Sequence, residues 1–174
     1  MSLLATADAK VFATGHAWLF GPRVGPRFPM GSRIVVGTDV GVLWGSAQDP
    51  LGQVDETVAT LGIGLLLGAV ATPSVTFGVG PRFEAGVGWF RGRAAEQTTV
   101  ASSAHSPLLL LALAGLASFR IEGPWFAFVG LDVGTSLYGF GLRAQTPDPR
   151  HVSDLLGPFV TGRVGVAVAF GGGR

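Results

Sequence analysis

The sequence predicts an all-β protein, an antiparallel up-and-down transmembrane β-barrel of eight strands. Its composition is the first reason, because 48% of the residues are hydrophobic and 13% are charged, whereas about 25% of a soluble domain is charged. Periodicity is the second, because six successive segments alternate large apolar residues with glycine, alanine or polar residues. Such a strand turns its large side chains to one face. Since the opposite face is small, the large apolar face is expected to look outward into lipid.

The same composition argues against membrane-spanning helices. A spanning helix needs about 20 consecutive apolar residues. The longest apolar runs, Leu61–Ala71 and Pro107–Ala117, are shorter and contain glycine, which is unfavourable inside helices. A closed barrel is the other structure that satisfies every backbone hydrogen bond in lipid. At 174 residues we expect a single barrel domain over 1–174.

The N-terminal region is the least regular. We expect an irregular segment over 1–9, a strand over Lys10–Phe20, and a turn over Gly21–Ser32, which is rich in glycine and proline. The segment Met1–Ala9 lacks the basic and apolar regions of a secretory signal. We therefore expect that a signal peptide or a further upstream region has been removed.

From Arg33 onwards the alternation is regular. The alternating segments are Arg33–Ser46, Thr57–Ala71, Ser74–Arg91, Pro107–Glu122, Trp125–Leu142 and Pro158–Phe170. With Lys10–Phe20 they make seven strands, but single-chain bacterial barrels have an even number, beginning at eight. Three sources of the missing strand remain open: it is contributed by Ser2–Ala9, concealed in Gly21–Ser32, or encoded upstream.

The connections give the barrel a direction. Ala71–Ser74 and Glu122–Trp125 are tight, whereas Ala47–Glu56, Gly92–Ser106 and Arg143–Asp154 are longer and polar. Outer-membrane barrels have short periplasmic turns and longer outer loops, so the tight turns are predicted to be periplasmic. On this topology an aromatic girdle lies near the strand ends. Its upper members are Trp44 and Trp89, and its lower members are Phe77, Phe119, Trp125 and Phe170.

The closing stretch GRVGVAVAF, Gly162–Phe170, resembles the C-terminal signal of outer-membrane barrels. The pattern of most of the chain is similar to that of small eight-stranded barrels of the OmpA-like, OmpX-like and OmpW-like kind. This resemblance implies a place in the bacterial outer membrane, with the lipid bilayer and the barrel assembly machinery as partners. The tail Gly171–Arg174 departs from the pattern, because family members usually end on the aromatic residue.

Five inward charges fall at comparable depth: Asp39, Arg82, Glu84, Asp132 and Arg163. Charges in a low-dielectric lumen must be paired. Asp132 and Arg163 lie at similar height on consecutive strands, so we expect them to be close neighbours. We interpret the cluster as a salt-bridge plug, because an eight-stranded barrel is just wide enough to be filled by side chains. The alternative is a gate or an ion path.

A second set of inward residues lies nearer the outer end. It comprises Leu43, Phe90, Leu108, Leu110, Tyr138, Phe140 and Phe159. We interpret this set as a packed apolar plug. The alternative is a pocket, or a lateral route, for a small apolar molecule.

The sequence carries no strong catalytic signature. His105 and His151 fall in predicted outer loops beside serines, and we interpret them as polar loop residues; the alternative is a loop-borne lipid hydrolase. GVGPRF at Gly78–Phe83 lacks the strand-to-helix context of a dinucleotide site. The chain has no cysteine, which excludes disulfides and thiolate metal sites. We expect no enzyme activity and no cofactor.

Charge excludes one class of partner. The formal net charge is +1, and no basic stretch interleaved with aromatic residues is present to follow a phosphate backbone, so nucleic acid is not an expected partner. We predict a membrane anchor or structural component of the cell envelope, or a subunit of an envelope complex. The alternative is a small passage or binding barrel for apolar molecules.

Overall fold

The computed structural model describes residues 1–14, 18–49, 52–72, 74–94, 103–139, 141–144 and 150–170. These residues form strands and their turns. Over these ranges, no helix has the length and apolar character needed to span a membrane.

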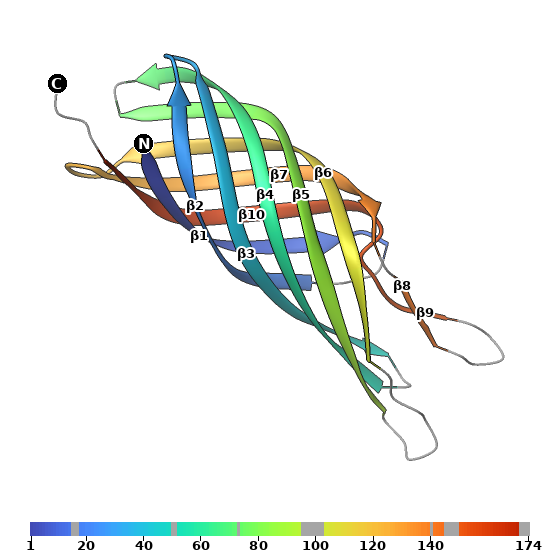
Figure 1. The fold of residues 1–174 in the computed structure, drawn as a ribbon. Helices are drawn as coiled ribbons and strands as arrows, with labels where there is room; N and C mark the ends of the chain where they lie inside the picture. Colours follow the sequence, from blue (N-terminus) through green and yellow to red (C-terminus); the bar gives the residue numbers. More distant parts are fainter. Residues whose placement is uncertain are drawn as a thin grey trace.

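Eight antiparallel strands close into a barrel in the order β1-β10-β7-β6-β5-β4-β3-β2 (Figure 1). They are β1 (Ser2–Phe12), β2 (Trp18–Met30), β3 (Ile34–Asp49), β4 (Gly52–Thr72), β5 (Val75–Ala94), β6 (Ser103–Arg120), β7 (Trp125–Tyr138) and β10 (Gly157–Ala169). Two short strands, β8 (Gly141–Ala144) and β9 (Arg150–Asp154), form a separate hairpin between β7 and β10. The predicted eight-stranded antiparallel barrel is confirmed.

The two ends of the barrel differ. The N-terminus and the end of β10 lie at the end where short turns join β2 to β3, β4 to β5 and β6 to β7 (Figure 1). We call this the short-turn end, and the opposite end, from which the β8–β9 hairpin projects, the loop end. The predicted tight connections Ala71–Ser74 and Glu122–Trp125 fall at the short-turn end. The predicted loop Ala47–Glu56 was too long, because pairing between β3 and β4 continues to Asp49 and Gly52.

The N-terminal prediction was wrong in its boundaries. Residues 1–9 are not irregular, because Ser2–Phe12 forms β1 and pairs with both β10 and β2. The proposed strand Lys10–Phe20 is divided between β1 and β2. The proposed turn Gly21–Ser32 supplies most of β2, and only its last residues turn. Two of the places considered for the missing strand, Ser2–Ala9 and Gly21–Ser32, therefore both contribute to strands.

Proline is compatible with β2 because its effect falls on one neighbour. β2 pairs with β1 without interruption, whereas its ladder with β3 has no partners at Gly21–Pro22 and Gly25–Pro26. Successive residues of an antiparallel strand bond to opposite neighbours. Both prolines therefore remove an N–H on the β3 side only. The alternation itself persists, with Trp18, Phe20 and Phe28 exposed and Leu19 and Arg23 buried.

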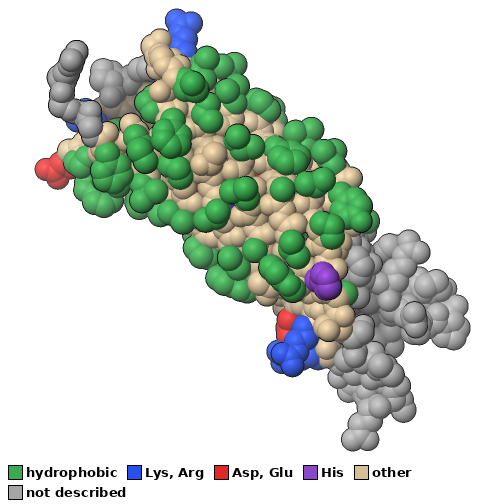
Figure 2. Space-filling view, viewed as in Figure 1, with side chains coloured by type: hydrophobic (Ala, Val, Ile, Leu, Met, Phe, Trp, Pro, Cys, Tyr) green, Lys and Arg blue, Asp and Glu red, His purple; other side chains and the backbone are tan. Residues whose placement is uncertain are grey.

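Large apolar side chains cover the outside of the barrel wall. Figure 2 shows them as a broad hydrophobic surface between polar extremities. On β4, for example, Leu61, Ile63 and Leu67 are 60%, 52% and 54% exposed. Soluble proteins rarely expose contiguous apolar surfaces of this extent. An apolar outer band with small or polar inward residues is the pattern of transmembrane barrels.

Candidate functional site

Eight charged side chains meet inside the barrel, and we call them the ionic layer. They are Asp8, Lys10, Arg23, Asp39, Arg82, Glu84, Asp132 and Arg163, each buried. The layer contains four cations and four anions, so its formal charges balance. Its members come from β1, β2, β3, β5, β7 and β10, because each strand turns alternate residues inward. The five charges predicted from the sequence all belong to this layer.

Arg82 lies at the centre of the ionic layer. Its guanidinium binds Asp39 with two nitrogens, Nη1 to Oδ2 at 2.7 Å and Nη2 to Oδ1 at 2.6 Å. Its Nε donates to Glu84 Oε1 at 2.8 Å. Such two-pronged pairing is the strongest arrangement available to arginine and carboxylate. Arg82 therefore ties β5 to β3 across the lumen.

Residues of β1 and β2 complete the network. Lys10 Nζ lies 2.7 Å from Glu84 Oε2. Arg23 contacts Asp8 Oδ2 through Nε at 2.8 Å and Asp39 Oδ1 through Nη1 at 2.5 Å. Asp39 is thus shared by Arg23 and Arg82, and Glu84 by the same two arginines and by Lys10. Each of these carboxylates is therefore paired with cations although it is buried.

Asp132 and Arg163 form an ion pair between β7 and β10. This contact was predicted from their similar heights on consecutive strands. The register explains the contact, because Thr161 of β10 lies opposite Asp132. Arg163 Nε also lies 3.4 Å from Asp8 Oδ2. This pair is therefore joined to the network through β1.

Glycine on the lumen face makes room for these long side chains. A Cβ atom at Gly62 of β4 would lie 2.3 Å from Arg82 Nη2 and 2.7 Å from Asp39 Oδ1. Both distances are shorter than van der Waals contact allows. The central ion pair therefore depends on a residue without a side chain on β4, the strand between β3 and β5.

An apolar layer follows the ionic layer toward the loop end. This buried cluster consists of Phe12, Leu19, Leu43, Val54, Val58, Phe90, Leu108, Leu110, Ala112, Leu155 and Phe159. Five residues of the predicted upper apolar set are among them: Leu43, Phe90, Leu108, Leu110 and Phe159. The rings of Phe12 and Phe159 lie 5.6 Å apart. Lys10 Nζ lies 4.7 Å from the Phe159 ring centre, so the two layers are in contact.

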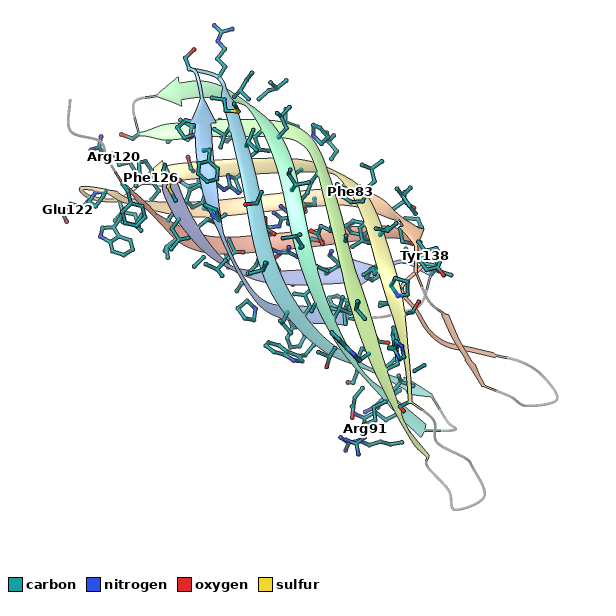
Figure 3. All side chains as sticks on the ribbon, in the orientation of Figure 1. Phe83, Arg91, Arg120, Glu122, Phe126 and Tyr138 are labelled. Carbon is teal, nitrogen blue, oxygen red and sulfur yellow. The ribbon has the colours of Figure 1, made fainter. Side chains whose placement is uncertain are left out.

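Tyr138 was wrongly assigned to the lumen. It is 53% exposed and lies toward the loop end on the outside (Figure 3). The ladder between β6 and β7 shifts there, since Leu109 pairs with Tyr138 but Leu110 pairs with Ser136. Leu137 is the extra residue of a β-bulge, and a bulge reverses the inward and outward alternation beyond it. Phe140, the other aromatic residue predicted for this end, lies outside the described residues.

The lumen contains a small void beside the ionic layer, on the side of the short-turn end. This void measures about 20 Å³ and is lined by Leu4, Leu66, Leu116, Asp39 and Arg82, among others. That volume holds about one water molecule. A second apolar cluster of Leu4, Phe128 and Ala167 lies next to it.

The six predicted girdle residues all face outward. Trp44, Phe77, Trp89, Phe119, Trp125 and Phe170 are between 39% and 53% exposed. Trp44 and Trp89 occupy one register row, because both pair with Thr57 of β4. The other four lie near the short-turn end. Trp18 and Phe20 of β2 join the loop-end set, and the sequence analysis missed them because it ended a strand at Phe20, where β2 in fact continues.

The ionic layer has three members that the sequence reasoning did not assign. Asp8 and Lys10 were missed because their outward neighbours on β1 are the small residues Ala7 and Ala9. Arg23 was missed because it lies between Pro22 and Val24 in a segment interpreted as a turn. The available signal was period-two polarity, with Thr6, Asp8 and Lys10 all on one face.

The sequence analysis placed His105 and His151 in outer loops, and the two predictions have different outcomes. His105 does not lie in a loop, because β6 begins at Ser103, and its side chain is exposed on the outer face. The side chain of His151 lies outside the described part of the chain, as does the tail Gly171–Arg174.

Comparison with known proteins supports the fold. No protein-family model matches the chain, and no curated protein sequence matches it either. Similar solved structures include Neisserial surface protein A, with 13% identity, 97% of this chain and 95% of that chain covered, and a TM-score of 0.58. A major outer membrane protein from Thermus thermophilus has 16% identity, coverage of 98% and 100%, and a TM-score of 0.55.

A third similar structure is the attachment invasion locus protein Ail of Yersinia pestis. It has 11% identity, coverage of 97% and 95%, and a TM-score of 0.54. Identities this low carry information about the fold alone. The eight antiparallel strands, the apolar outer band and these neighbours agree: the chain has the fold of the small outer-membrane β-barrels.

Proposed function

We propose that this protein resides in the bacterial outer membrane as an anchor or structural component of the cell envelope, with a lumen filled by side chains. The observation that carries the proposal is the ionic layer. None of its eight charged side chains is more than 7% exposed. An ion path would instead leave charged groups in contact with water along the lumen.

The apolar layer supports the same proposal over the alternative of a binding barrel for apolar molecules. Phe90, Leu108 and Leu110 are at most 3% exposed and pack against one another in one cluster. A ligand pocket commonly has a volume of about 300 Å³ or more. The void beside the ionic layer is far smaller, at about 20 Å³, and the wider recess of about 330 Å³ lies beyond it at the short-turn end, away from the apolar layer.

Planar-bilayer recording tests the filled lumen. The folded protein, identified by its heat-modifiable migration in gels, is expected to produce no stepwise current, while a large porin in the same bilayer provides the positive control. Regular current steps from the folded protein would contradict the proposal.

A second experiment addresses the alternative. A fluorescent naphthylamine is titrated against the protein in detergent, and no saturable binding is expected. Saturable binding that is abolished by Phe90→Trp, but not by the outward change Trp89→Phe, would favour the binding barrel.

A further inference from the structure

The outer wall carries a basic patch at the loop end, formed by Arg91 and Arg93 of β5 and His105 of β6. All three side chains are exposed. Figure 2 shows basic, acidic and histidine side chains close together where the hydrophobic surface ends, and Figure 3 locates Arg91 there. The patch has no role in the ionic layer, because it lies on the opposite face of the wall.

The register fixes the height of the basic patch relative to the aromatic girdle. Trp89 pairs with His105 on one side and with Thr57 on the other. Arg91 and Arg93 follow Trp89 at alternate positions, so all three point to the same outer face. Each strand residue advances about 3.3 Å. The guanidinium groups therefore originate within about 15 Å of the Trp89 position along β5.

The charges of the patch are only partly compensated. Asp55 Oδ2 lies 2.7 Å from Arg93 Nη2, and Asp55 Oδ1 accepts a hydrogen bond from Gln53 Nε2 at 2.7 Å. Within the described ranges, neither Arg91 nor His105 forms an ion pair with a carboxylate. Asp55, which lies opposite Arg91 in the ladder, is thus bound by Arg93, and among the described residues no carboxylate pairs with the guanidinium of Arg91.

The patch also has a shape that suits a ligand. A recess of about 710 Å³ lies against it, lined by Arg91, Arg93 and His105 together with Asp55, Thr57, Trp89 and Ser103. Guanidinium, hydroxyl and indole N–H groups are all hydrogen-bond donors. The planar fork of arginine matches the oxygens of a phosphate group. The lining thus offers two guanidinium groups against one carboxylate, which Arg93 already binds, beside an aromatic residue.

We propose that the basic patch binds the phosphorylated headgroup of a membrane lipid. Tryptophan side chains of transmembrane barrels lie at headgroup level, and the patch faces the same way as Trp89, sideways into the membrane boundary. A lipid whose acyl chains lie along the apolar wall presents its phosphate at this height. The inference rests on the proposed membrane location.

The test is a titration of the detergent-folded protein with diphosphorylated lipid A, followed by native mass spectrometry. The double variant Arg91→Gln/Arg93→Gln is expected to bind about tenfold more weakly, since a hydrogen bond to a charged group contributes at least that factor. The matched control Arg33→Gln/Arg120→Gln removes the same charge at the short-turn end and is expected to bind like the wild type. Equal losses in both variants, or no loss in the first, would overturn the proposal.

Two competition experiments distinguish a lipid headgroup from a soluble anion as the ligand of the basic patch. Inorganic phosphate and a soluble sulfated oligosaccharide are added as competitors at the same anion concentration. Weak competition is expected, because neither has acyl chains to lie on the apolar wall. Competition equal to that of the lipid would overturn a lipid site in favour of a soluble anion. Failure to insert into vesicles would contradict the membrane location instead, and headgroup binding in detergent is measured independently of it.

Discussion

The ionic layer and the apolar layer lie next to each other along the lumen, and β1, β2, β3, β5 and β10 contribute to both. On β1, Lys10 belongs to the first and Phe12 to the second; on β10, Arg163 and Phe159 divide in the same way. All four are at most 5% exposed. The ionic layer is a network in which each carboxylate is shared, whereas the apolar layer consists of contacts without direction. A substitution in the ionic layer should therefore weaken the contacts of several other members. A substitution in the apolar layer should affect only its immediate contacts.

The largest expected effect is the loss of Arg82 from the ionic layer. Arg82→Met leaves Asp39 and Glu84 with fewer partners in a buried site, and breaking a buried pair costs about 3–5 kcal/mol. Urea-induced unfolding in lipid vesicles measures the loss. Arg82→Lys keeps the charge without the two-pronged geometry. Its stability against unfolding should lie between those of the wild type and Arg82→Met. A loss for Arg82→Met below that for Arg82→Lys would disagree with the network.

A smaller and more local effect is expected in the apolar layer. Leu110→Ala removes a side chain that is 1% exposed and should cost about 2–4 kcal/mol, as large-to-small changes in packed cores do. The same unfolding assay applies. Combined with Arg82→Met, the two losses should depart from additivity by no more than about 1 kcal/mol, the coupling expected because Leu110 lies opposite Glu84, a partner of Arg82. Strong coupling between them would contradict the division into two layers.

The smallest effect concerns the room that glycine provides in the ionic layer. Gly62→Ala would place a methyl group 2.3 Å from Arg82 Nη2 and should destabilise by about 1–3 kcal/mol, the usual cost of overpacking. Gly64→Ala is the matched control, because the nearest atoms there are 3.8 Å away. Equal stabilities of the two variants would show that the ion pair does not need the space at Gly62.

The clarity of the alternation differs between strands, and this difference explains how much of the fold and of the two layers could be predicted from the sequence. Alternation predicted β3 to β7 and β10, because each sets large apolar residues against glycine or polar ones. It also predicted five members of the ionic layer and five of the apolar layer. It failed in β1 and β2, where alanine and proline occupy outward positions and weaken the periodic signal. It failed at Tyr138 because a bulge at Leu137 is a property of strand pairing.

The pairing within the ionic layer was only partly predictable. The ion pair of Asp132 and Arg163 followed from adjacent strands of known direction. The contacts of Arg82 with Asp39 and of Lys10 with Glu84 cross the lumen between strands that are not neighbours. They depend on the closure and stagger of the whole barrel, which periodicity along one strand does not encode.

The central claim is that the apolar outer wall faces lipid, and cysteine accessibility tests it most directly because the chain has no cysteine of its own. Leu113→Cys on the outer face and Ala114→Cys on the lumen face are each treated in vesicles with a lipophilic maleimide and with a charged, water-soluble thiol reagent. Leu113 is 60% exposed and Ala114 is 6% exposed. The cysteine at position 113 should react only with the lipophilic reagent, and the cysteine at position 114 with neither. Rapid reaction at position 113 with the charged reagent would contradict the account.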